Sequence, residues 1–580
     1  MASFLIWWSP EAKSIDDCLW DRMVAEVMCR PQSKNQAPIR WDLHTRYVRA
    51  VAVRTLSCEP DPYRHIAPDI EVFAALRYHL CDRELAGRRF TEPAALARVE
   101  DSARRLTLTR DLLGHRHLVW TRVSGGILAS TREEPLLIHP EVSPVWNDSH
   151  IAAMLAQIPP EDTSTPFQQI FSIAPGMTAE FTPKGMREFR ERFEPCEDVA
   201  GCTDTQLANR FRDLLQDSVY RAACGANRIG LSISSGLDAA SIAAVLMQQH
   251  KSPVVPVGVC YGYRTEDGAD IDERVLAAQL CQRLGIEFVG IDASSIPLSF
   301  TLDGGWNSPI GAVQENPYRE IKSEVYRRLA DHGADVVLVG HGADQFAMMP
   351  ANWIWSAWAN KRYDWIIEGL RSYLRHRGLW GTLRHPSIRR LVKYLLQGRT
   401  GLMRSIAPPE LPTCFRDQWM EARTQALSRL SAWPDPSRAA EHFNAFESAD
   451  YALEVPNAEH YGLDIRSPYR DWNLVRFVLS TPTFLMAGPI GYKWLLKRAA
   501  APFLDSQWIN RPKFGDLSPL WKRNYDRRRA QIAERLPRLG RWVDQYFSPN
   551  SSFGINSQDG YRLTQLNSFL SWAESPLQRE

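Results

Sequence analysis

The sequence has no apolar run long enough to cross a lipid bilayer, and its short apolar opening at residues 4–8 follows no basic segment. A spanning helix needs about 20 consecutive apolar residues, and a secretory signal places a longer apolar core behind a basic start. We therefore expect no membrane partner and no signal peptide. Internal repeats and low-complexity segments are also missing, which argues against solenoid and fibrous architectures.

The sequence also lacks paired cysteines and an excess of charge of one sign. Its 10 cysteines form no Cys-x-x-Cys pair and no zinc-ligand spacing, so we expect reduced thiols in a cytoplasmic protein. The 69 Lys and Arg against 67 Asp and Glu leave a net charge of +2. A charge this small predicts no nucleic-acid partner.

Residues 229–249 combine a short β-rich run (IGLS), a polar turn (ISSGLD) and a helical run. A strand, a tight turn and a helix in this order direct backbone N–H groups toward an anion at the helix N-terminus. The turn contains no lysine, so it is not a Walker loop, whereas Asp238 at its end can hold Mg²⁺ against phosphate oxygens. The segment predicts a nucleotide α-phosphate site, with an ordinary strand-to-helix turn as the alternative.

This turn resembles the PP-loop of the ATP pyrophosphatases, whose usual pattern is Ser-Gly-Gly-hydrophobic-Asp-Ser. Two positions depart from that pattern. Ser235 stands in place of the second glycine, and Ala239 replaces the final serine, although Ser241 follows closely. One hydrogen-bond donor of the pattern is therefore expected to be lost.

A second segment, residues 335–344 (DVVLVGHGAD), again ends a strand-like run with a carboxylate. Ligands of open α/β sheets bind at the C-terminal ends of the strands, where Asp344 is expected. The segment resembles the Ser-Gly-Glu-Gly-Ala-Asp-Glu-Leu-Phe block of the asparagine synthetase family. His341 takes the position of the first Glu and Gln345 that of the second acid, so Asp344 is retained while the acids beside it are not.

Three later segments resemble further blocks of the same synthetase domain, in the same order. They are residues 460–471 (HYGLDIRSPYRD), 491–497 (GYKWLLK) and 511–515 (RPKFG). Several weak motifs in the correct order are far more specific than any one of them. By this resemblance we identify a synthetase domain of the asparagine synthetase family.

The first part of the chain resembles the other domain of that family at residues 104–114 (RRLTLTRDLLG), 125–130 (GGILAS) and 167–176 (FQQIFSIAPG). In glutamine-using members this domain is an N-terminal-nucleophile (Ntn) amidohydrolase, which needs Cys directly after the initiator Met. Here Ala2 and Ser3 follow Met1, and the first cysteine is Cys18. The resemblance implies a structural remnant without glutaminase activity, in which residues 4–8 form a buried first strand.

The resemblance implies an α/β protein with two domains. Residues 1–197 are expected to form a degenerate Ntn-hydrolase-like αββα sandwich. Residues 198–580 are expected to form a PP-loop synthetase domain around a doubly wound parallel sheet. Near the boundary an extended pattern gives way to an amphipathic helix over residues 205–223.

A helical insertion, basic and rich in aromatic residues, is predicted at about residues 350–440. Between residues 361 and 404, eleven Lys or Arg stand against only Asp364 and Glu368. This run is either a solvated surface or a docking site for an acidic peptide or a partner protein. Several aromatic residues suit either a substrate pocket or the core: Trp353, Trp355, Trp358 and Trp365. Apolar residues at helical spacing predict one packed face: Trp365, Ile366, Leu370, Tyr373 and Leu374.

The resemblance implies a carboxylate that attacks the α-phosphorus of ATP in the presence of Mg²⁺, followed by an amine that attacks the acyl-adenylate. Asp238 and Asp344 are the predicted Mg²⁺ ligands. Lys493 is the predicted cation at the oxyanion, as the matching lysine is in β-lactam synthetases. The predicted ATP contacts are Leu231, Ser232, Ser234, Ser235, Gly236, Leu237, Asp238, Val257, Gly340 and Asp344.

The amine must also lose a proton. An imidazole titrates near neutral pH, so His341 is the predicted base, with a hydrogen-bonded structural histidine as the alternative. A carboxylate partner is expected among Glu447, Asp450 and Glu454, which would share one face of a single helix. Of these three we choose Glu454.

Without a glutaminase the enzyme has no ammonia source of its own, so its nucleophile is expected to be an amine of the substrate or of a co-substrate. Two branches of the family share this property, the β-lactam synthetases and the lasso peptide cyclases. Holding two reacting groups together contributes about 7–11 kcal/mol, whereas each doubling of a loop costs only about 0.6 kcal/mol. A pocket that folds the substrate is therefore expected to be the main catalyst.

We predict a lasso peptide cyclase that adenylates an Asp or Glu side chain of a precursor peptide and joins it to the N-terminal amine. ATP and Mg²⁺ are the expected cofactors. The expected partners are the precursor peptide and a leader peptidase or leader-binding protein. The alternatives are another amide synthetase, either β-lactam-like or ammonia-dependent, and a non-catalytic peptide-binding scaffold.

Overall fold

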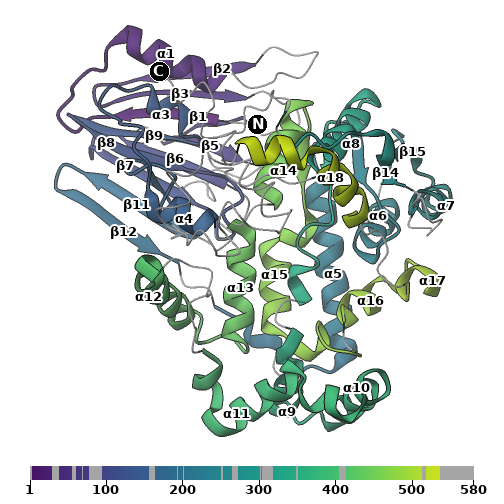
Figure 1. Cartoon of the computed structure of the whole chain (residues 1–580). Coiled ribbons are helices and arrows are strands. Elements are labelled where there is room, and N and C mark those ends of the chain that lie inside the picture. The colour runs from purple at the N-terminus through teal and green to yellow at the C-terminus, as the bar shows by residue number, and fades with distance from the viewer. Residues whose placement is uncertain are drawn as a thin grey trace.

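The computed structural model describes residues 3–535 with internal gaps. The gaps are residues 29–37, 55–60, 68, 77–93, 156–162, 192–193, 200, 250–252, 264–271, 301, 303–317, 348–349, 404–412, 448–449, 491 and 512–516. Figure 1 shows two neighbouring β-sheets in the first third of the chain, with a mostly helical remainder beside and below them. The fold is α/β, as predicted.

Two antiparallel six-stranded sheets contain every described strand up to residue 190. The first has the order β10-β8-β9-β1-β3-β2 and the second β12-β11-β7-β6-β5-β4. The strands of the first are β1 Ser3–Trp8, β2 Ile39–His44, β3 Val48–Arg54, β8 Val119–Val123, β9 Gly126–Ser130 and β10 Phe171–Ser172. Those of the second are β4 Tyr63–Ala67, β5 Ile70–Leu76, β6 Ala94–Glu100, β7 Arg105–Arg110, β11 Met177–Thr182 and β12 Gly185–Arg190.

Strand β1 is buried on both of its faces, because side chains alternate along a strand. Phe4, Ile6 and Trp8 pack between the two sheets. Leu5 and Trp7 point the other way, into the cluster that includes α1 (Asp17–Met28) and α3 (Glu134–Leu137). The prediction that residues 4–8 form a buried first strand is therefore confirmed.

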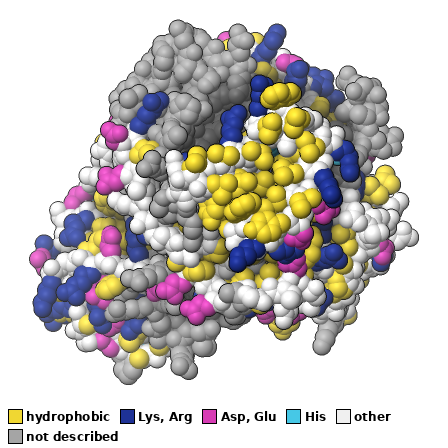
Figure 2. Space-filling view, turned by 90° about the horizontal axis from the view of Figure 1, so that it is seen from below, with side chains coloured by type: hydrophobic (Ala, Val, Ile, Leu, Met, Phe, Trp, Pro, Cys, Tyr) yellow, Lys and Arg dark blue, Asp and Glu magenta, His cyan; other side chains and the backbone are white. Residues whose placement is uncertain are grey.

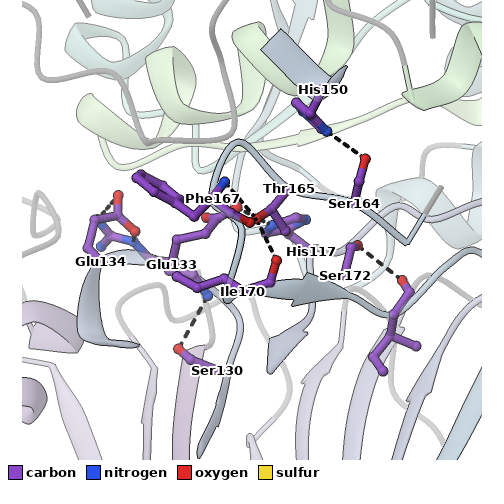
Figure 3. Close-up of polar contacts among 12 residues, drawn as sticks. His117, Ser130, Glu133, Glu134, His150, Ser164, Thr165, Phe167, Ile170 and Ser172 are labelled. Atoms are coloured by element: carbon purple, nitrogen blue, oxygen red, sulfur yellow. Dashed lines mark hydrogen bonds and ion pairs between the residues drawn. The ribbon is translucent and has the colours of Figure 1, made fainter. Parts of the chain in front are cut away.

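Figure 3 shows a polar cluster between α3 and the loop of residues 163–172. The buried Glu133 carboxylate accepts from His117 Nε2 at 2.7 Å. Burial opposes the charge, yet His117 holds the pKa of Glu133 below its usual value. His150, on α4 (Asp148–Leu155), contacts Ser164 Oγ through Nδ1 at 2.7 Å, and burial lowers the pKa of His150 to about 3. These contacts satisfy buried polar groups of the sandwich.

The third sheet is parallel, with the order β15-β14-β13-β16-β17. Its strands are β13 Ile229–Ser232, β14 Val257–Gly262, β15 Glu287–Asp292, β16 Val336–Leu338 and β17 Asp464–Arg466. The order along the sheet reverses between β13 and β16, so the connections leave to opposite faces there. Ligands of doubly wound sheets bind at this switch point, beyond the C-terminal strand ends.

Helices cover both faces of the parallel sheet, which explains why β16 is apolar at every position. Val336 and Leu338 face one core, with α5 (Asp204–Ala223), α6 (Leu237–Gln249) and α7 (Arg274–Leu284). Val337 faces the other, with α8 (Arg319–Asp331) and α14 (Asp450–His460). The predicted helix over residues 205–223 is confirmed, and Thr203 and Gln206 form a capping box at its start. The remaining helices of the domain are α15 Trp472–Ser480, α16 Trp494–Ala500, α17 Ser506–Ile509 and α18 Ser518–Arg535.

The predicted insertion is helical. It contains α9 Trp353–Ala359, α10 Tyr363–Leu383, α11 Pro386–Met403 and α12 Thr413–Arg429, followed by α13 Pro436–Glu447. Trp353, Trp355 and Trp365 are buried, whereas Trp358 is exposed, so three of the four tryptophans pack in the core. Leu374 is also exposed, in contrast to the predicted packed face. Among the described helices, none combines the length and apolarity of a membrane-spanning segment.

The two parts of the chain touch through the Arg-Asp-x-x-Gly turn that follows β7. Asp111 is fully buried and contacts His115 Nδ1 at 2.7 Å, and His115 Nε2 lies 2.9 Å from the Arg470 carbonyl oxygen. Arg116 lies 4.0 Å from Asp464 of β17. The N-terminal sandwich therefore supports the loop after β17. The exact domain boundary at residues 197 and 198 stays a prediction.

A buried ion pair at the edge strand β17 gives a test of this architecture. Arg466 and Asp464 are fully buried, and Arg466 also donates to the Ala222 and Cys224 carbonyl oxygens. Removing one partner of a buried pair costs about 3–5 kcal/mol. We expect Arg466→Met to lower the urea midpoint strongly in equilibrium unfolding. Arg122→Met, at an exposed position of β8, is the control and should leave the urea midpoint unchanged. Equal midpoints for the Arg466→Met and Arg122→Met variants would contradict a stabilising role of the Arg466–Asp464 pair.

Candidate active site

Two loops meet at the switch point of the parallel sheet. The PP-loop follows β13 and leads into α6, and the loop of residues 339–344 follows β16. They approach so closely that a Cβ built on Gly340 would lie 3.4 Å from the Cβ of Asp238. Gly342 has a φ of +97°, and a Cβ there would lie 3.1 Å from Tyr469, so this turn requires glycine.

Lys493 joins the two loops. Its Nζ lies 2.5 Å from Asp238 Oδ2 and 2.6 Å from Asp344 Oδ1, and the residue is only 5% exposed. The lysine precedes α16 and has a left-handed backbone with a φ of 53°. Such a backbone costs about 1–3 kcal/mol in a non-glycine residue and is concentrated at functional sites. The hydrogen bond from Lys493 N to the Met486 carbonyl oxygen, at 2.9 Å, helps to maintain it.

The charges at this cluster explain the protonation of the lysine. Burial opposes the ammonium charge, but the carboxylates of Asp238 and Asp344 outweigh it and raise the pKa of Lys493. Lys493 is therefore a fixed cation between two acids. Tyr492 OH contacts Asp344 Oδ1 at 3.3 Å, so the adjacent residue of the same motif also reaches this acid.

The donor set at this point has the chemistry that Mg²⁺ prefers. Mg²⁺ in nucleotide sites uses one or two carboxylates together with phosphate oxygens and water. Asp238 and Asp344 provide two carboxylates that both contact the Lys493 ammonium group. Each carboxylate uses one of its two oxygens for this contact. Among the described residues no group of three or more His, Cys, Asp or Glu could hold a metal. The pair therefore fits a metal that the nucleotide helps to hold.

His341 and Glu454 form a second cluster beside the first. His341 Nε2 lies 3.1 Å from Glu454 Oε1, and the Glu454 side chain is 3% exposed. Lys322 Nζ reaches the same oxygen at 3.2 Å, and Tyr326 OH donates to Oε2. Burial alone would raise the pKa of Glu454, but His341, Lys322 and Tyr326 hold it well below its usual value. Glu454 is therefore a buried anion with several donors.

Lys322 and Tyr326 were not predicted from the sequence. Both lie on α8, more than 120 residues before Glu454 in the chain, and their helical spacing alone indicates only an amphipathic helix. Glu447 is the last described residue of α13, and Asp450 and Glu454 lie on α14. Residues 448 and 449 lie outside the described residues, so the shared helix face of the three acids stays a prediction.

The block at residues 460–471 contacts both the PP-loop and the loop of residues 339–344. Tyr469 OH donates to the Asp238 carbonyl oxygen at 3.0 Å, and Ser467 Oγ donates to the His341 carbonyl oxygen. Both residues are buried. Of the other two blocks, Gly491 and residues 512–515 lie outside the described residues.

Several predicted ATP contacts lie in the PP-loop, and their side chains have different surroundings. Gly236 N donates to Ser234 Oγ at 3.1 Å. Ser235 is buried, and its hydroxyl donates to Glu273 Oε1 at 2.9 Å. Ser241 donates to the Leu237 carbonyl oxygen within α6, so its hydroxyl is directed back to the helix.

Val257 and Leu231 are buried in the cores on either side of the sheet. Val257 begins β14 and pairs with Gly230, whereas the PP-loop follows the other end of β13. Its side chain packs toward α8, so its place in the fold does not support the predicted contact with ATP. Ser232, Gly236, Leu237 and Gly340 lie in or beside the two loops, and their contacts with ATP stay predictions.

The fold and this site define a nucleotide-dependent α/β synthetase. The family model of asparagine synthase matches residues 210–549, which is more than half of the chain. The chain therefore belongs to the asparagine synthase family and is an ATP-dependent amide ligase. A comparison with curated proteins finds no match.

Solved structures are similar to the chain only at low identity. The U34-tRNA thiolase NcsA of Methanococcus maripaludis is 13% identical, with 44% of this chain and 85% of that chain covered and a TM-score of 0.20. Glutamine phosphoribosylpyrophosphate amidotransferase of B. subtilis, in complex with ADP and GMP, is 9% identical over 59% and 81%, with a TM-score of 0.22. A structure titled as the allosteric regulatory enzyme of purine biosynthesis is 11% identical over 58% and 89%, with a TM-score of 0.22. Scores this low do not establish a common fold.

The pKa of Glu454 leads to a test of pH-dependent stability. A carboxyl group whose folded-state pKa is depressed contributes stability above its unfolded value, about 4.3, and loses it as the pH falls toward the folded value. We expect Glu454→Gln to lower the free energy of unfolding by about 3–5 kcal/mol at neutral pH. Urea midpoints of the two proteins should converge as the pH falls below about 4.3. Glu368→Gln, at an exposed position, is the control. A difference in urea midpoint between the wild type and Glu454→Gln that does not change with pH would contradict the lowered pKa of Glu454.

Proposed function

We propose that this ligase is a lasso peptide macrolactam synthetase. In this reaction an Asp or Glu side chain of a precursor peptide is adenylated, and the N-terminal amine of the same peptide forms the isopeptide ring with release of AMP and pyrophosphate. The observation that carries the proposal is the pair of adjoining clusters. One places a fixed cation between two acids, and the other joins an imidazole to a buried carboxylate.

The N-terminal part of the chain favours an amine that the substrate already carries. Strand β1 contains no cysteine, and the first cysteine of the sequence, Cys18, is exposed on α1. Ser3 is buried at the start of β1, where its hydroxyl is shielded from solvent. We therefore propose that the sandwich has a supporting role and produces no ammonia.

For adenylation, backbone N–H groups of the PP-loop and of the α6 N-terminus are placed to bind the phosphates of ATP. Asp238 and Asp344 would hold Mg²⁺, which neutralises phosphate charge while pyrophosphate leaves. The substrate carboxylate oxygen bonds to the α-phosphorus as the bond to the β-phosphate bridging oxygen breaks. Lys493 contributes positive charge beside the same phosphates.

For ring closure, the peptide amine attacks the acyl carbon and AMP leaves. His341 takes the proton that the amine nitrogen loses, and Glu454 stabilises the imidazolium that results. Lys493 stabilises the negative oxygen that forms at the acyl carbon. Both clusters lie around the loop of residues 339–344, so one bound peptide can meet them in succession.

We propose that the precursor peptide arrives with the help of a leader peptidase or a leader-binding protein, in a compartment that contains ATP and keeps cysteines reduced. The six described cysteines are free thiols. Another amide ligase, either β-lactam-like or ammonia-dependent, is the second candidate, because the family contains such enzymes. A peptide-binding scaffold without catalysis is less well supported, because Lys493 retains a strained backbone beside both acids.

The substrate can be tested by ATP–pyrophosphate exchange with the purified full-length chain. Acceptors should include aspartate with ammonia, carboxyethyl-amino acids, and linear peptides encoded beside the gene. We expect exchange and AMP release only with a linear peptide, together with a product that has lost one water. Turnover of aspartate with ammonia would exclude the cyclase, and absence of exchange with every acceptor would favour the scaffold.

The two clusters can be distinguished by their separate steps. We expect His341→Gln to retain exchange but to lower ring formation by about 10²–10⁴-fold, because a general base acts only on the amine. Asp344→Asn should lower both exchange and ring formation, because the Asp344 carboxylate would hold Mg²⁺ during adenylation and ring formation follows that step. Mass spectrometry of the peptide product and exchange of labelled pyrophosphate measure the two steps. Equal losses in both assays for His341→Gln would contradict its role.

A further inference from the structure

An exposed apolar surface lies on the helical insertion. Figure 2 shows apolar side chains gathered on the face seen from below, where α9, α10 and α11 lie in Figure 1. Single exposed apolar residues are common, whereas a group of them on consecutive helices marks an interaction surface. We name this group the α10–α11 surface, and its members are Leu374, Leu379, Trp380, Leu383, Val392, Leu395 and Leu396.

The helices that carry this surface are held from their other side. Trp353 Nε1 donates to Tyr373 OH at 3.0 Å, which attaches α10 to α9. Trp355 stacks on Tyr394 of α11 with ring centroids 5.3 Å apart. These contacts hold α10 before its break at Gly378 and α11 before its break at Gly398. The Tyr373 ring also lies against His385, with ring centroids 4.3 Å apart, at the end of the segment that follows Gly378.

The surface projects from the protein. Trp380 is 72% exposed and Leu396 is 78% exposed, which is more than side chains lining a groove would show. Both residues lie beside glycines that interrupt the helices, Gly378 with a φ of 67° and Gly398 with a φ of 60°. A projecting apolar edge can insert among the headgroups of a lipid bilayer, whereas a folded protein partner would need a matching groove to receive it.

Positive charge surrounds this apolar edge. Residues 369–409 contain nine Lys or Arg and no Asp or Glu, although the whole chain carries a net charge of only +2. Within the described part of that segment, none of the seven basic residues forms an ion pair with a described acid. They are Arg371, Arg375, Arg377, Arg384, Arg389, Arg390 and Lys393.

We infer that the α10–α11 surface binds an anionic phospholipid bilayer, with both helices lying along the membrane plane. Helices with Trp and Leu on one side and Arg or Lys around them bind at the boundary between headgroups and acyl chains. A second copy of the chain is disfavoured, because the same basic residues would then face each other. A contact of this kind needs no membrane-spanning helix, so the lack of one among the described helices does not argue against it.

Vesicle sedimentation with the full-length chain tests the inference. We expect binding to vesicles that contain phosphatidylglycerol, weak binding to phosphatidylcholine alone, and a decrease with added salt. The combined change Trp380→Gln with Leu396→Gln should abolish sedimentation with the vesicles. Its matched control is Tyr220→Gln with Val275→Gln, two exposed apolar positions outside the insertion.

The basic residues are tested separately. Changing Arg375, Arg377 and Arg384 to Gln should lower the partition coefficient by about 10²-fold, since each charge near an anionic surface contributes severalfold. Arg122, Lys184 and Arg187, which are exposed elsewhere, provide the matched triple change. Thermal unfolding of each variant checks that the fold is retained.

Three outcomes would overturn the inference. The first is absence of binding to anionic vesicles at low salt, and the second is binding that the α10–α11 variants do not reduce. The third is a concentration-dependent dimer in solution that the Trp380 and Leu396 changes dissociate, because the surface would then join two copies. None of these measurements requires peptide substrate or ATP, so they are independent of the proposed cyclisation.

Discussion

The contact of Lys493 with Asp238 and Asp344 is the interaction on which the site depends. Two acids at the ends of β13 and β16 lie close together because the strand order reverses between these strands. Like charges so placed repel unless a cation lies between them. The chain provides that cation from a segment about 150 residues further on, in a backbone conformation that lysine rarely adopts. The arrangement of the two loops thus relies on this charge balance.

The N-terminal sandwich is connected to this balance through the loop after β17. His115 contacts the Arg470 carbonyl oxygen, and the same loop supplies Tyr469 to the PP-loop and Ser467 to the His341 segment. The sandwich therefore supports the synthetase domain structurally. Removing it would expose Asp111 and uncouple the loop that positions both clusters. This coupling gives the sandwich a structural role beside the synthetase site.

In the second cluster, the charge to be balanced is the buried carboxylate of Glu454. Glu454 remains charged although it is buried, because His341 and Lys322 share one of its oxygens. The departures from the family pattern are consistent with each other, since an imidazole in place of an acid requires a carboxylate partner nearby. The α10–α11 surface has the opposite property, because its apolar side chains are exposed and the seven basic residues of its segment form no ion pair with a described acid. The inner aromatic residues of the insertion belong to the core, and its outer face is directed to the surroundings of the protein.

The sequence by itself determined the α/β class, the buried first strand, the helix before the PP-loop and the residues of both loops, because strand and helix periods and turn residues are local properties. It also indicated Asp238, Asp344, Lys493, His341 and Glu454 through motif order. Only the tertiary structure decided that Lys493 reaches both acids, that Lys322 and Tyr326 complete the Glu454 cluster, and that the Val257 side chain lies in the core beside α8. These facts depend on the order of strands in the sheet and on contacts between distant segments, which no local pattern encodes.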